Sequence, residues 1–342
     1  MPTDSPPGDP SAAGSAAAVH AVDAADAADA ADVEVSGLLT EPQAAEVLNL
    51  AERAAREDGV GPLSEHVMLY LRYGGDRQAR NFLLWRDGSL AGYGHLDPTD
   101  PVAAPSGEMI IDPAFRHRGL GLTLARALIA EAGDRGLRLW AHGDLPAATR
   151  LAAAAGFRRT RALWRMQRSL HGQLGAPELA DGLQVRAFQA GQDEDAWTAL
   201  NRKAFARHPE QGTWTSEDLN LREREPWFDP AGFFLADRDG RLVGFHWTKM
   251  HEADDHEADD HEASDHGHEP IGEVYVVGVD PDERGTGLGR ALTLIGLRYL
   301  RDRGLAQVML YVDEDNTPAI KLYESLGFTR RDTDAMFTHA PQ

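Results

Sequence analysis

Two short stretches rich in glycine and arginine have residue types and spacing suited to binding an anion. They read RHRGLG at 116–121 and RGTGLGR at 284–290, so they lie 168 residues apart. Each follows an apolar run ending in Asp-Pro and precedes a helical pattern, which would place free backbone N–H groups at a helix N-terminus. Glycine lets a phosphate approach the backbone, and the arginines add positive charge. Neither stretch matches the P-loop or the dinucleotide-binding pattern, so each is either another kind of pyrophosphate loop or a simple strand-to-helix turn.

The elements needed to position these loops also occur twice. In each half a two-strand hairpin and a buried strand precede the loop, and an amphipathic helix, a strand and a helix ending in Gly-Phe follow it. The predicted strands lie at 81–88, 89–97, 107–113 and 138–142, and again at 232–240, 241–249, 272–281 and 307–313. The duplication predicts an α/β fold (α+β, mixed sheet) with two tandem domains, at 36–172 and 173–342. A further helix is predicted from about residue 39, with Thr40 as its N-cap.

Two low-complexity stretches account for most of the net negative charge of the 342-residue chain. Residues 1–35 and 251–270 together hold sixteen acidic residues and no Lys or Arg, against a net charge of −21. The first stretch contains an Ala-Ala-Asp repeat and is predicted to be a disordered tail. The second is predicted to be a surface insertion. Its histidines lie five apart with carboxylates between them, a pattern that also suits Zn or Ni, but no metal requirement is predicted.

The composition excludes several classes of protein. The chain has no continuous basic stripe, which argues against a nucleic-acid partner. It has no apolar run long enough to span a bilayer, and its first basic residue is Arg53, so the sequence predicts a cytoplasmic location and no membrane partner. The absence of cysteine excludes disulfides, thiolate metal sites and an acyl-cysteine intermediate. Any acyl transfer would therefore be direct.

The motifs resemble those of a known superfamily. VVGVDPDERGTGLGRAL is similar to the acetyl-CoA signature of the Gcn5-related N-acetyltransferase (GNAT) superfamily, and YVDEDNTPAIKLYESLGF to its second cofactor segment. With HPEQGTW, WFDPAGFFLA and GFHWTK, the duplicated chain resembles the tandem mycothiol acetyltransferase family of actinobacteria over about 36–340, apart from the insertion. The resemblance implies acetyl transfer from acetyl-CoA to the cysteinyl amine of cysteinyl-glucosaminyl-inositol, a thiol pseudodisaccharide. Two fused copies also favour a monomer.

The resemblance further implies acetyl-CoA contacts in both halves. In the first half they fall on the strand before the loop and on the loop itself: Met109, Ile110, Ile111, Arg116, His117, Arg118, Gly119, Leu120 and Gly121. In the second half they fall on the strand, the loop and the start of the last helix: Val277, Gly278, Val279, Arg284, Gly285, Thr286, Gly287, Leu288, Gly289, Arg290, Asn316, Thr317, Pro318, Ala319, Ile320 and Lys321.

Acetyl transfer to an amine needs a base, an oxyanion donor and an acid for the leaving thiolate. Glu273, at the start of a buried strand and on the face of Tyr275 and Val277 by alternation, is the candidate base. Tyr323 matches the family position of the general acid, and a backbone N–H at 277–279 is the expected oxyanion donor. Family positions for the acceptor fall on Glu65, Glu210, Lys249, Glu273 and Tyr311.

The first half lacks these proton-handling groups. The 168-residue offset places Pro105 at the position of Glu273 and Glu108 at that of Val276, and the offset of 171 between the last helices places Ala152 opposite Tyr323. The first half is therefore predicted to bind acetyl-CoA without catalysis. Two alternatives stay open: acetylation of another amine, such as an aminoglycoside, polyamine or protein N-terminus, and a non-enzymatic acetyl-CoA or metal sensor.

Overall fold

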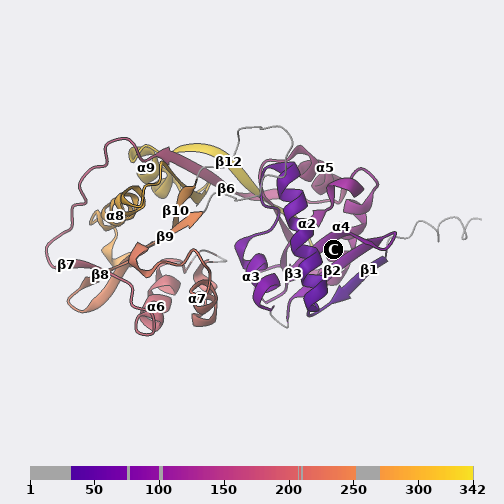
Figure 1. Cartoon of the computed structure of the whole chain (residues 1–342), viewed down its shortest axis with the longest axis horizontal. Helices are drawn as coiled ribbons and strands as arrows, with labels where there is room; N and C mark the ends of the chain where they lie inside the picture. Colours follow the sequence, from indigo (N-terminus) through magenta and orange to yellow (C-terminus); the bar gives the residue numbers. More distant parts are fainter. Residues whose placement is uncertain are drawn as a thin grey trace, which may run out of the picture.

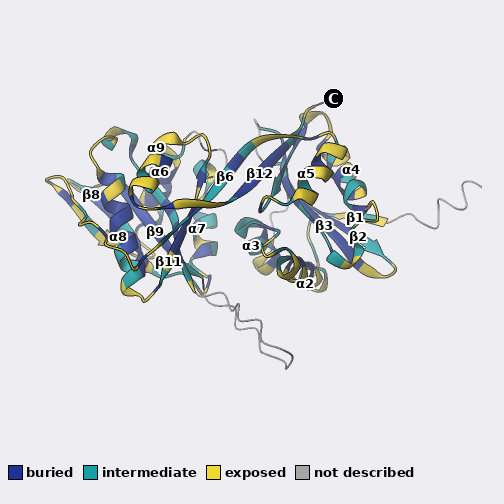
Figure 2. Ribbon diagram, turned by 90° about the horizontal axis from the view of Figure 1, so that it is seen from above, coloured by how far each residue is buried: buried dark blue, intermediate teal, exposed yellow. Residues whose placement is uncertain are grey.

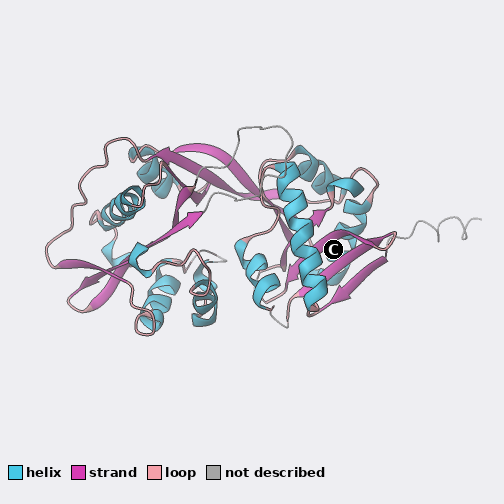
Figure 3. Cartoon of the chain, viewed as in Figure 1, coloured by secondary structure: helices cyan, strands magenta, loops and turns pink. Residues whose placement is uncertain are grey.

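The computed structural model describes residues 32–74, 78–99, 103–206, 208, 211–251 and 270–341. These residues form two lobes side by side along the longest axis of the molecule (Figure 1). Each lobe has a β-sheet with helices packed against it (Figure 3). Among the helices of the described residues, none is both long and apolar enough to cross a membrane. Most of the predicted tail (1–31) and of the predicted insertion (252–269) lies outside the described residues, so both stay predictions.

The first half of the chain begins with a strand and a long capped helix. Its strands are β1 (Asp32–Ser36), β2 (Arg80–Arg86), β3 (Ser89–Asp97), β4 (Ser106–Ile111), β5 (Leu137–Ala141) and β6 (Arg158–Ser169). Its helices are α2 (Glu41–Asp58), α3 (Glu65–Tyr73), α4 (Leu120–Ala132) and α5 (Pro146–Ala154), with 3₁₀ turns η1 (Pro113–Phe115) and η2 (Gly133–Arg135). The N-cap of α2 is Thr40, as predicted, because Thr40 and Gln43 form a reciprocal capping box.

The second half repeats this order. Its strands are β7 (Leu183–Ala187), β8 (Phe233–Arg238), β9 (Arg241–His251), β10 (Ile271–Val279), β11 (Gln307–Asp313) and β12 (Thr329–His339). Its helices are α6 (Glu194–Ala204), α7 (Ser216–Arg222), α8 (Leu288–Asp302) and α9 (Thr317–Ser325), with 3₁₀ turns η3 (Gln211–Thr213), η4 (Pro230–Gly232) and η5 (Pro281–Glu283). Helix α8 starts 168 residues after α4, and α9 starts 171 residues after α5, so the predicted duplication is a structural repeat.

Both halves bury their sheets on two faces. In β2, Phe82 and Leu84 pack in the cluster that contains α4, whereas the intervening Leu83 packs against α2 and α3. In the second half, α8 and α9 cover one face, and α6 and α7 cover the other through an aromatic cluster around Trp197 and Trp247. Figure 2 accordingly shows the strands darker than the outward sides of the helices. The strands therefore read as nearly continuous apolar runs rather than as strict alternations.

The two halves exchange their last strands. The sheet order is β1-β2-β3-β4-β5-β12-β6-β11-β10-β9-β8-β7, so β12 from the end of the chain lies beside β5, and β6 lies beside β11. Both neighbours are antiparallel, with Ala335 opposite Ala141 and Tyr311 opposite Arg165. Figures 1 and 2 show β6 and β12 crossing together from one lobe to the other. One twelve-stranded sheet therefore runs through both lobes within the described part of the chain.

This exchange changes the meaning of the predicted domain boundary at 172/173. By chain order β6 belongs to the first half, yet Met166, on β6, and Leu170, just after it, pack in the core of the second lobe. Ala335 and Phe337 of β12 in turn pack in the core of the first lobe. The sequence boundary separates two repeats, but neither repeat contains its own complete sheet.

The predicted tail ends earlier than residue 35. Residues 32–36 form β1, which pairs antiparallel with β2. Val33 packs against the core of the first lobe, and the side chain of Glu34 accepts hydrogen bonds from Trp85 and Gln43. The alternation of valine with acidic residues suits an edge strand, so the prediction that residues 32–35 are disordered is wrong.

Candidate active site

Two parallel strand pairs open like a V beside the glycine loops. Strand β10 pairs with β11 only at Gly272 and Glu273, although it continues to Val279. Strand β4 likewise pairs with β5 only at Ser106 and Gly107. On the side turned away from β9 and β3, the backbone edges of 277–279 and of 109–111 therefore face an opening rather than a neighbouring strand. Each opening offers main-chain donors and acceptors to an extended amide-bearing ligand.

The loop of the second half has the geometry of an anion cradle. Gly285 and Gly287 have left-handed φ angles of 82° and 84°, and α8 starts at the next residue, Leu288. Residues 284–287 are exposed, so the first N–H groups of α8 open to solvent. Arg290 is held beside the end of α9 by a hydrogen bond of 2.7 Å to the Ser325 hydroxyl. A pyrophosphate fits this arrangement of free donors and arginines.

The last helix of the second half places a phenol near this loop. Tyr323 packs edge-to-face on Phe328, and burial raises the pKa of its hydroxyl to about 12. The side chain of Asn316 accepts a hydrogen bond from Ala319 N–H as the N-cap of α9. Thr317, Pro318 and Lys321 are exposed, Ala319 is half-buried, and the side chains of Ile320 and Leu288 lie in apolar cores. Ile320 and Leu288 could therefore meet a cofactor only through their backbones.

Glu273 is the buried carboxylate at the closed end of the opening, where β10 and β11 separate. It is 7% exposed and lies at the last position where β10 and β11 pair. Its Oε2 accepts a hydrogen bond of 2.7 Å from His251 Nε2. Lys249 lies directly opposite it on β9, but the Lys249 ammonium is bound elsewhere.

A β-bulge corrects the predicted face of Glu273. The register of β10 shifts between Val274 and Val276, which makes Tyr275 the extra residue. Val276 and Tyr275 consequently pack on the α6 and α7 side, whereas Val274 and Val277 pack on the α8 side. Glu273 alternates with Val274, so it shares its face with Tyr275 but not with Val277. Simple alternation could not show this, because it assumes an unbroken strand.

An ionic network ties this site to the first half. The Lys249 ammonium lies 2.5 Å from Glu65 Oε1, and the Tyr275 hydroxyl donates to Glu65 Oε2. Arg222, which is 2% exposed, donates from Nε to the Tyr275 oxygen at 2.7 Å and stacks on Trp214. Burial alone would raise the pKa of Glu65, but the nearby Lys249 and Arg222 charges and the two hydrogen bonds lower it overall. A first-half carboxylate therefore remains ionised inside the second-half site.

Tyr311 lies on the same side of the sheet. Its side chain is 42% exposed and lies opposite Arg165 of β6. Desolvation of the Tyr311 hydroxyl raises its pKa, and the Glu273 charge raises it further. The Arg165 charge opposes this shift. Arg165 also lies 3.6 Å from Asp332. The structure thus brings Glu65, Lys249, Glu273 and Tyr311 to one region, and Glu210 lies outside the described residues.

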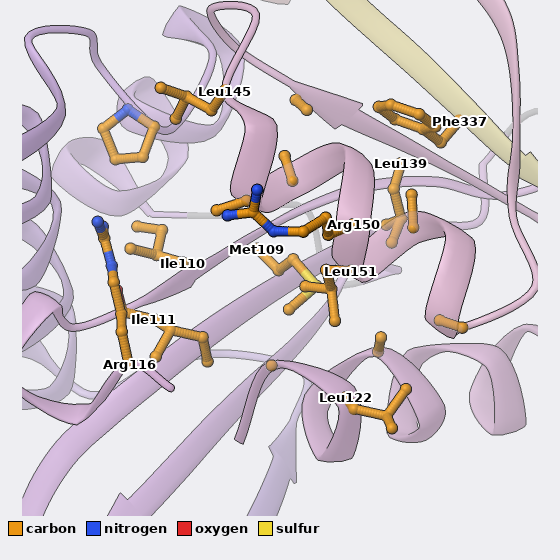
Figure 4. A pocket seen from close by; sticks show the side chains of 18 of the residues that line it. Met109, Ile110, Ile111, Arg116, Leu122, Leu139, Leu145, Arg150, Leu151 and Phe337 are labelled. Atoms are coloured by element: carbon orange, nitrogen blue, oxygen red, sulfur yellow. The ribbon is translucent and has the colours of Figure 1, made fainter. Parts of the chain in front are cut away.

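The corresponding opening in the first half is a cavity of about 750 Å³ (Figure 4). Its lining is mostly apolar, including Met109, Leu151 and Phe337, with Arg116 and Arg150 as the labelled cations. The volume and lining suit an organic ligand. Arg116 forms a two-pronged ion pair with Asp58, at 2.6 and 2.8 Å, which fixes its guanidinium.

The loop of the first half copies the backbone of the second. His117 and Gly119 have left-handed φ angles of 61° and 80°, matching Gly285 and Gly287. Arg118 lies over the Phe115 ring, and Gly121 packs against Leu151. The residues predicted to hold acetyl-CoA in the first half therefore surround one cavity, apart from Arg118, which lies on the rim of the loop.

The position equivalent to Glu273 is Ser106 rather than Pro105. Ser106 lies opposite Asp97, just as Glu273 lies opposite Lys249, because the bulge in β10 adds one residue after Glu273. Ala152 occupies the place of Tyr323 on α5, as predicted, and is buried. Neither position offers a carboxylate or a phenol.

A buried ionic cluster lies beside the first cavity instead. The His142 imidazole lies 3.1 Å from Asp334 and 3.7 Å from Glu108, and Asp334 comes from the exchanged strand β12. Burial lowers the pKa of His142, but the hydrogen bond to Asp334 and the charges of Glu108 and Asp334 outweigh this and raise it to about 10. The Ser64 N–H also donates to Glu108 at 2.7 Å. His142 is therefore a protonated structural contact at neutral pH and is not a free base.

Several residues of these sites were not predicted from the sequence. Arg150 carried a usable signal, because the 171-residue offset aligns it with Lys321. The other three residues carried no signal in the sequence. The contact of His251 depends on the end of a hairpin, that of Arg222 on a buried aromatic cluster, and that of Arg165 on the strand exchange. Within the described ranges, no group of three or more His, Cys, Asp or Glu is arranged to hold a metal ion.

Comparison with known proteins agrees with this architecture. The model of the acetyltransferase (GNAT) family matches residues 44–157 and 195–328, one match in each half. A mycothiol acetyltransferase of Thermobispora bispora is 62% identical over 291 residues, covering 85% of this chain and 94% of that protein. One of Acidothermus cellulolyticus is 57% identical over 308 residues, covering 89% and 94%.

A solved structure shares the tandem fold. A tandem GNAT protein from the clavulanic acid biosynthesis pathway covers 91% of this chain and 99% of its own, with a TM-score of 0.64 and 19% identity. That likeness supports the fold, and the sequence relatives support the narrower assignment. The chain belongs to the acetyltransferase (GNAT) family and, within it, to the mycothiol acetyltransferases.

Proposed function

We propose that this chain transfers the acetyl group of acetyl-CoA to the cysteinyl amine of cysteinyl-glucosaminyl-inositol, giving mycothiol and CoA. The family membership supports an N-acetyltransferase that uses acetyl-CoA, and the names of the relatives support this acceptor. The observation that carries the proposal is the position of Glu273. It lies where β10 leaves β11, next to the backbone edge 277–279 and to the ionic network formed with Glu65.

In this proposal Glu273 removes the ammonium proton of the acceptor, directly or through water, and the amine attacks the acetyl carbonyl. A backbone N–H in 277–279 holds the carbonyl oxygen as negative charge develops on it. Tyr323 then donates a proton to the departing thiolate. Burial raises the pKa of the Tyr323 hydroxyl to about 12, so it carries a proton at neutral pH.

We also propose that the pseudodisaccharide binds in the polar region between the lobes. Glu65, Lys249 and Tyr311 offer charged and phenolic partners for sugar and inositol hydroxyls, and Glu210 is proposed as a fourth partner from the family resemblance. The contact between Lys249 and Glu65 keeps both groups in place before the acceptor arrives. This explains why a repeat without catalytic groups is kept, since it supplies Glu65.

For the first half we propose acetyl-CoA binding without catalysis. The cavity volume and the matched loop support binding, while Ser106 and Ala152 at the equivalent positions argue against proton transfer there. We further propose a cytoplasmic monomer that needs no metal. The exchanged strands support a monomer, because each repeat already completes its sheet with a strand of the other.

The test is release of CoA from acetyl-CoA with cysteinyl-glucosaminyl-inositol, compared with spermidine, an aminoglycoside and a peptide amine. We expect selective turnover of the thiol sugar, and a loss of 100-fold or more in kcat for Glu273→Gln, in line with the usual contribution of acid–base catalysis of about 10²–10⁴. Preference for another amine would refute the acceptor, and near wild-type turnover by the variant would refute the base. No turnover with any amine would favour an acetyl-CoA sensor.

A further inference from the structure

We propose that His251 acts through Glu273, both positioning its carboxylate and carrying its proton to solvent. The inference rests on the proposed function, because it assigns the route of the proton that Glu273 removes. His251 is the last residue of β9, opposite Ile271 and two positions from Glu273 in the hairpin. The two side chains meet at 2.7 Å between Nε2 and Oε2.

The exposure of the two side chains favours this route. The side chain of Glu273 is 9% exposed and that of His251 is 33% exposed. A bound acceptor would cover Glu273 further, since Glu65, Lys249 and Tyr311 lie on the same side. A proton taken by Glu273 must still leave before the next turnover. The imidazole joins the buried carboxylate to water.

Among the residues that the structure describes, no other group beside Glu273 provides this route. Lys249 lies opposite Glu273 on β9, but its ammonium binds Glu65 and lies over the face of Trp227. From β11, the Tyr311 hydroxyl has a raised pKa and stays protonated, so it cannot accept the proton. Within the described residues, the hydrogen bond to His251 is the one that the Glu273 carboxylate makes.

The proton count requires one release per turnover. The acceptor enters as an ammonium and loses two protons as the amide forms, of which one protonates the CoA thiolate through Tyr323. The other passes from nitrogen to the Glu273 carboxylate. Exchange with solvent then moves the ring proton of His251 from Nε2 to Nδ1, so that Nε2 can accept the proton of the Glu273 carboxyl group. The resulting imidazolium gives its Nδ1 proton to water, which restores the Nε2–H tautomer that donates to the carboxylate. No oxidant or further reactant is needed.

Two variants of the full chain separate positioning from proton transfer. His251→Gln keeps a hydrogen-bond donor for Glu273 but cannot relay a proton, and His251→Ala removes both roles. We expect kcat to fall about 10-fold or more in both variants, with KM for acetyl-CoA and for the acceptor within about threefold. Added imidazole should restore kcat of His251→Ala several-fold. The matched control is His171→Gln, at an exposed histidine in the segment after β6, which should respond to neither treatment.

A second readout does not depend on turnover. The ¹⁵N and ¹³C signals of the His251 ring, followed by NMR in the resting protein, should move in Glu273→Gln, whereas those of His171 should not. A wild-type kcat in His251→Gln, a slow His251→Ala that imidazole does not rescue, or an unchanged His251 signal would each overturn the inference. Absence of turnover in the wild-type protein would overturn the proposed function as well, so the two failures are distinguishable.

Discussion

The buried cluster of His142, Glu108 and Asp334 makes the strand exchange sensitive to pH, and Asp334→Asn tests this. The native pKa of His142 is about 10, against 6.5 for the free side chain. A group with a raised native pKa stabilises the fold fully below its unfolded pKa, and loses that contribution as pH rises through the native pKa. At about 1.4 kcal/mol per pKa unit, protonation of His142 should stabilise the fold by an amount on the order of 4–5 kcal/mol below pH 6.5 and slightly less at pH 7.

The free energy of unfolding should therefore fall by up to about 1.4 kcal/mol per pH unit as wild-type protein goes from pH 7 to pH 10. Because Asp334 supplies the nearer of the two carboxylates, at 3.1 Å, its neutralisation should cost roughly 2–4 kcal/mol at pH 7. The difference between wild type and variant should shrink towards pH 10.5. Glu108 does not confuse this window, since its pKa is lowered and its own contribution is lost only in acid.

The measurement is chemical denaturation followed by tryptophan fluorescence and circular dichroism, at steps between pH 6.5 and 10.5. Asp332→Asn is the matched control, because Asp332 lies on the same strand but is part-exposed and 3.6 Å from Arg165. Exposed pairs contribute about 0–1 kcal/mol, so this variant should follow the wild-type profile. Parallel profiles for wild type and Asp334→Asn would refute the reasoning.

Three further predictions concern the site and the core. Glu65→Gln should raise the KM for the acceptor about 10-fold or more, because a hydrogen bond to a charged group contributes about 1.5–3 kcal/mol. The KM for acetyl-CoA should stay near the wild-type value, and equal changes in both KM values would contradict this. Arg165→Met should raise the KM for the acceptor in the same assay, because Arg165 lies opposite Tyr311. Arg159→Met should not, because Arg159 lies on the same strand but forms an exposed ion pair with Glu314. Gly296→Ala should lower the free energy of unfolding by about 1–3 kcal/mol, because the added Cβ would lie 2.1 Å from the His246 ring. An unchanged Tm in thermal unfolding would show that the ring can move.

The loops and the repeat could be predicted from the sequence because both depend on local chemistry. Glycines at 285 and 287 adopt left-handed φ, a helix starts directly after them, and the same spacing recurs in the first half. Thr40 with Gln43 marked the start of α2 for the same reason. Such features need only neighbouring residues, so reading the chain in order finds them.

The face of Glu273 required the register of the hairpin. Alternation along GEVYVVGV predicts one face for Glu273, Tyr275 and Val277, but a bulge at Tyr275 moves Val277 to the other. A bulge is fixed by pairing with β9 and by packing on both faces, which are not properties of the strand alone. The contact between Glu65 and Lys249 could not be predicted from the sequence either, since the two residues lie 184 positions apart.

By itself the sequence determined two repeats and their loops, because these follow from short-range patterns of size, charge and backbone freedom. The candidate carboxylate and phenol came from the resemblance to the GNAT superfamily. Only the tertiary structure decided which last strand completes which sheet. The edges of β5 and β11 can each accept an antiparallel strand, and both β6 and β12 can supply one. The choice depends on long-range packing of Met166 in one core and Phe337 in the other, and on the Asp334 contact with His142. That choice joins the two repeats into one sheet and brings Arg165 opposite Tyr311 in the second-half site.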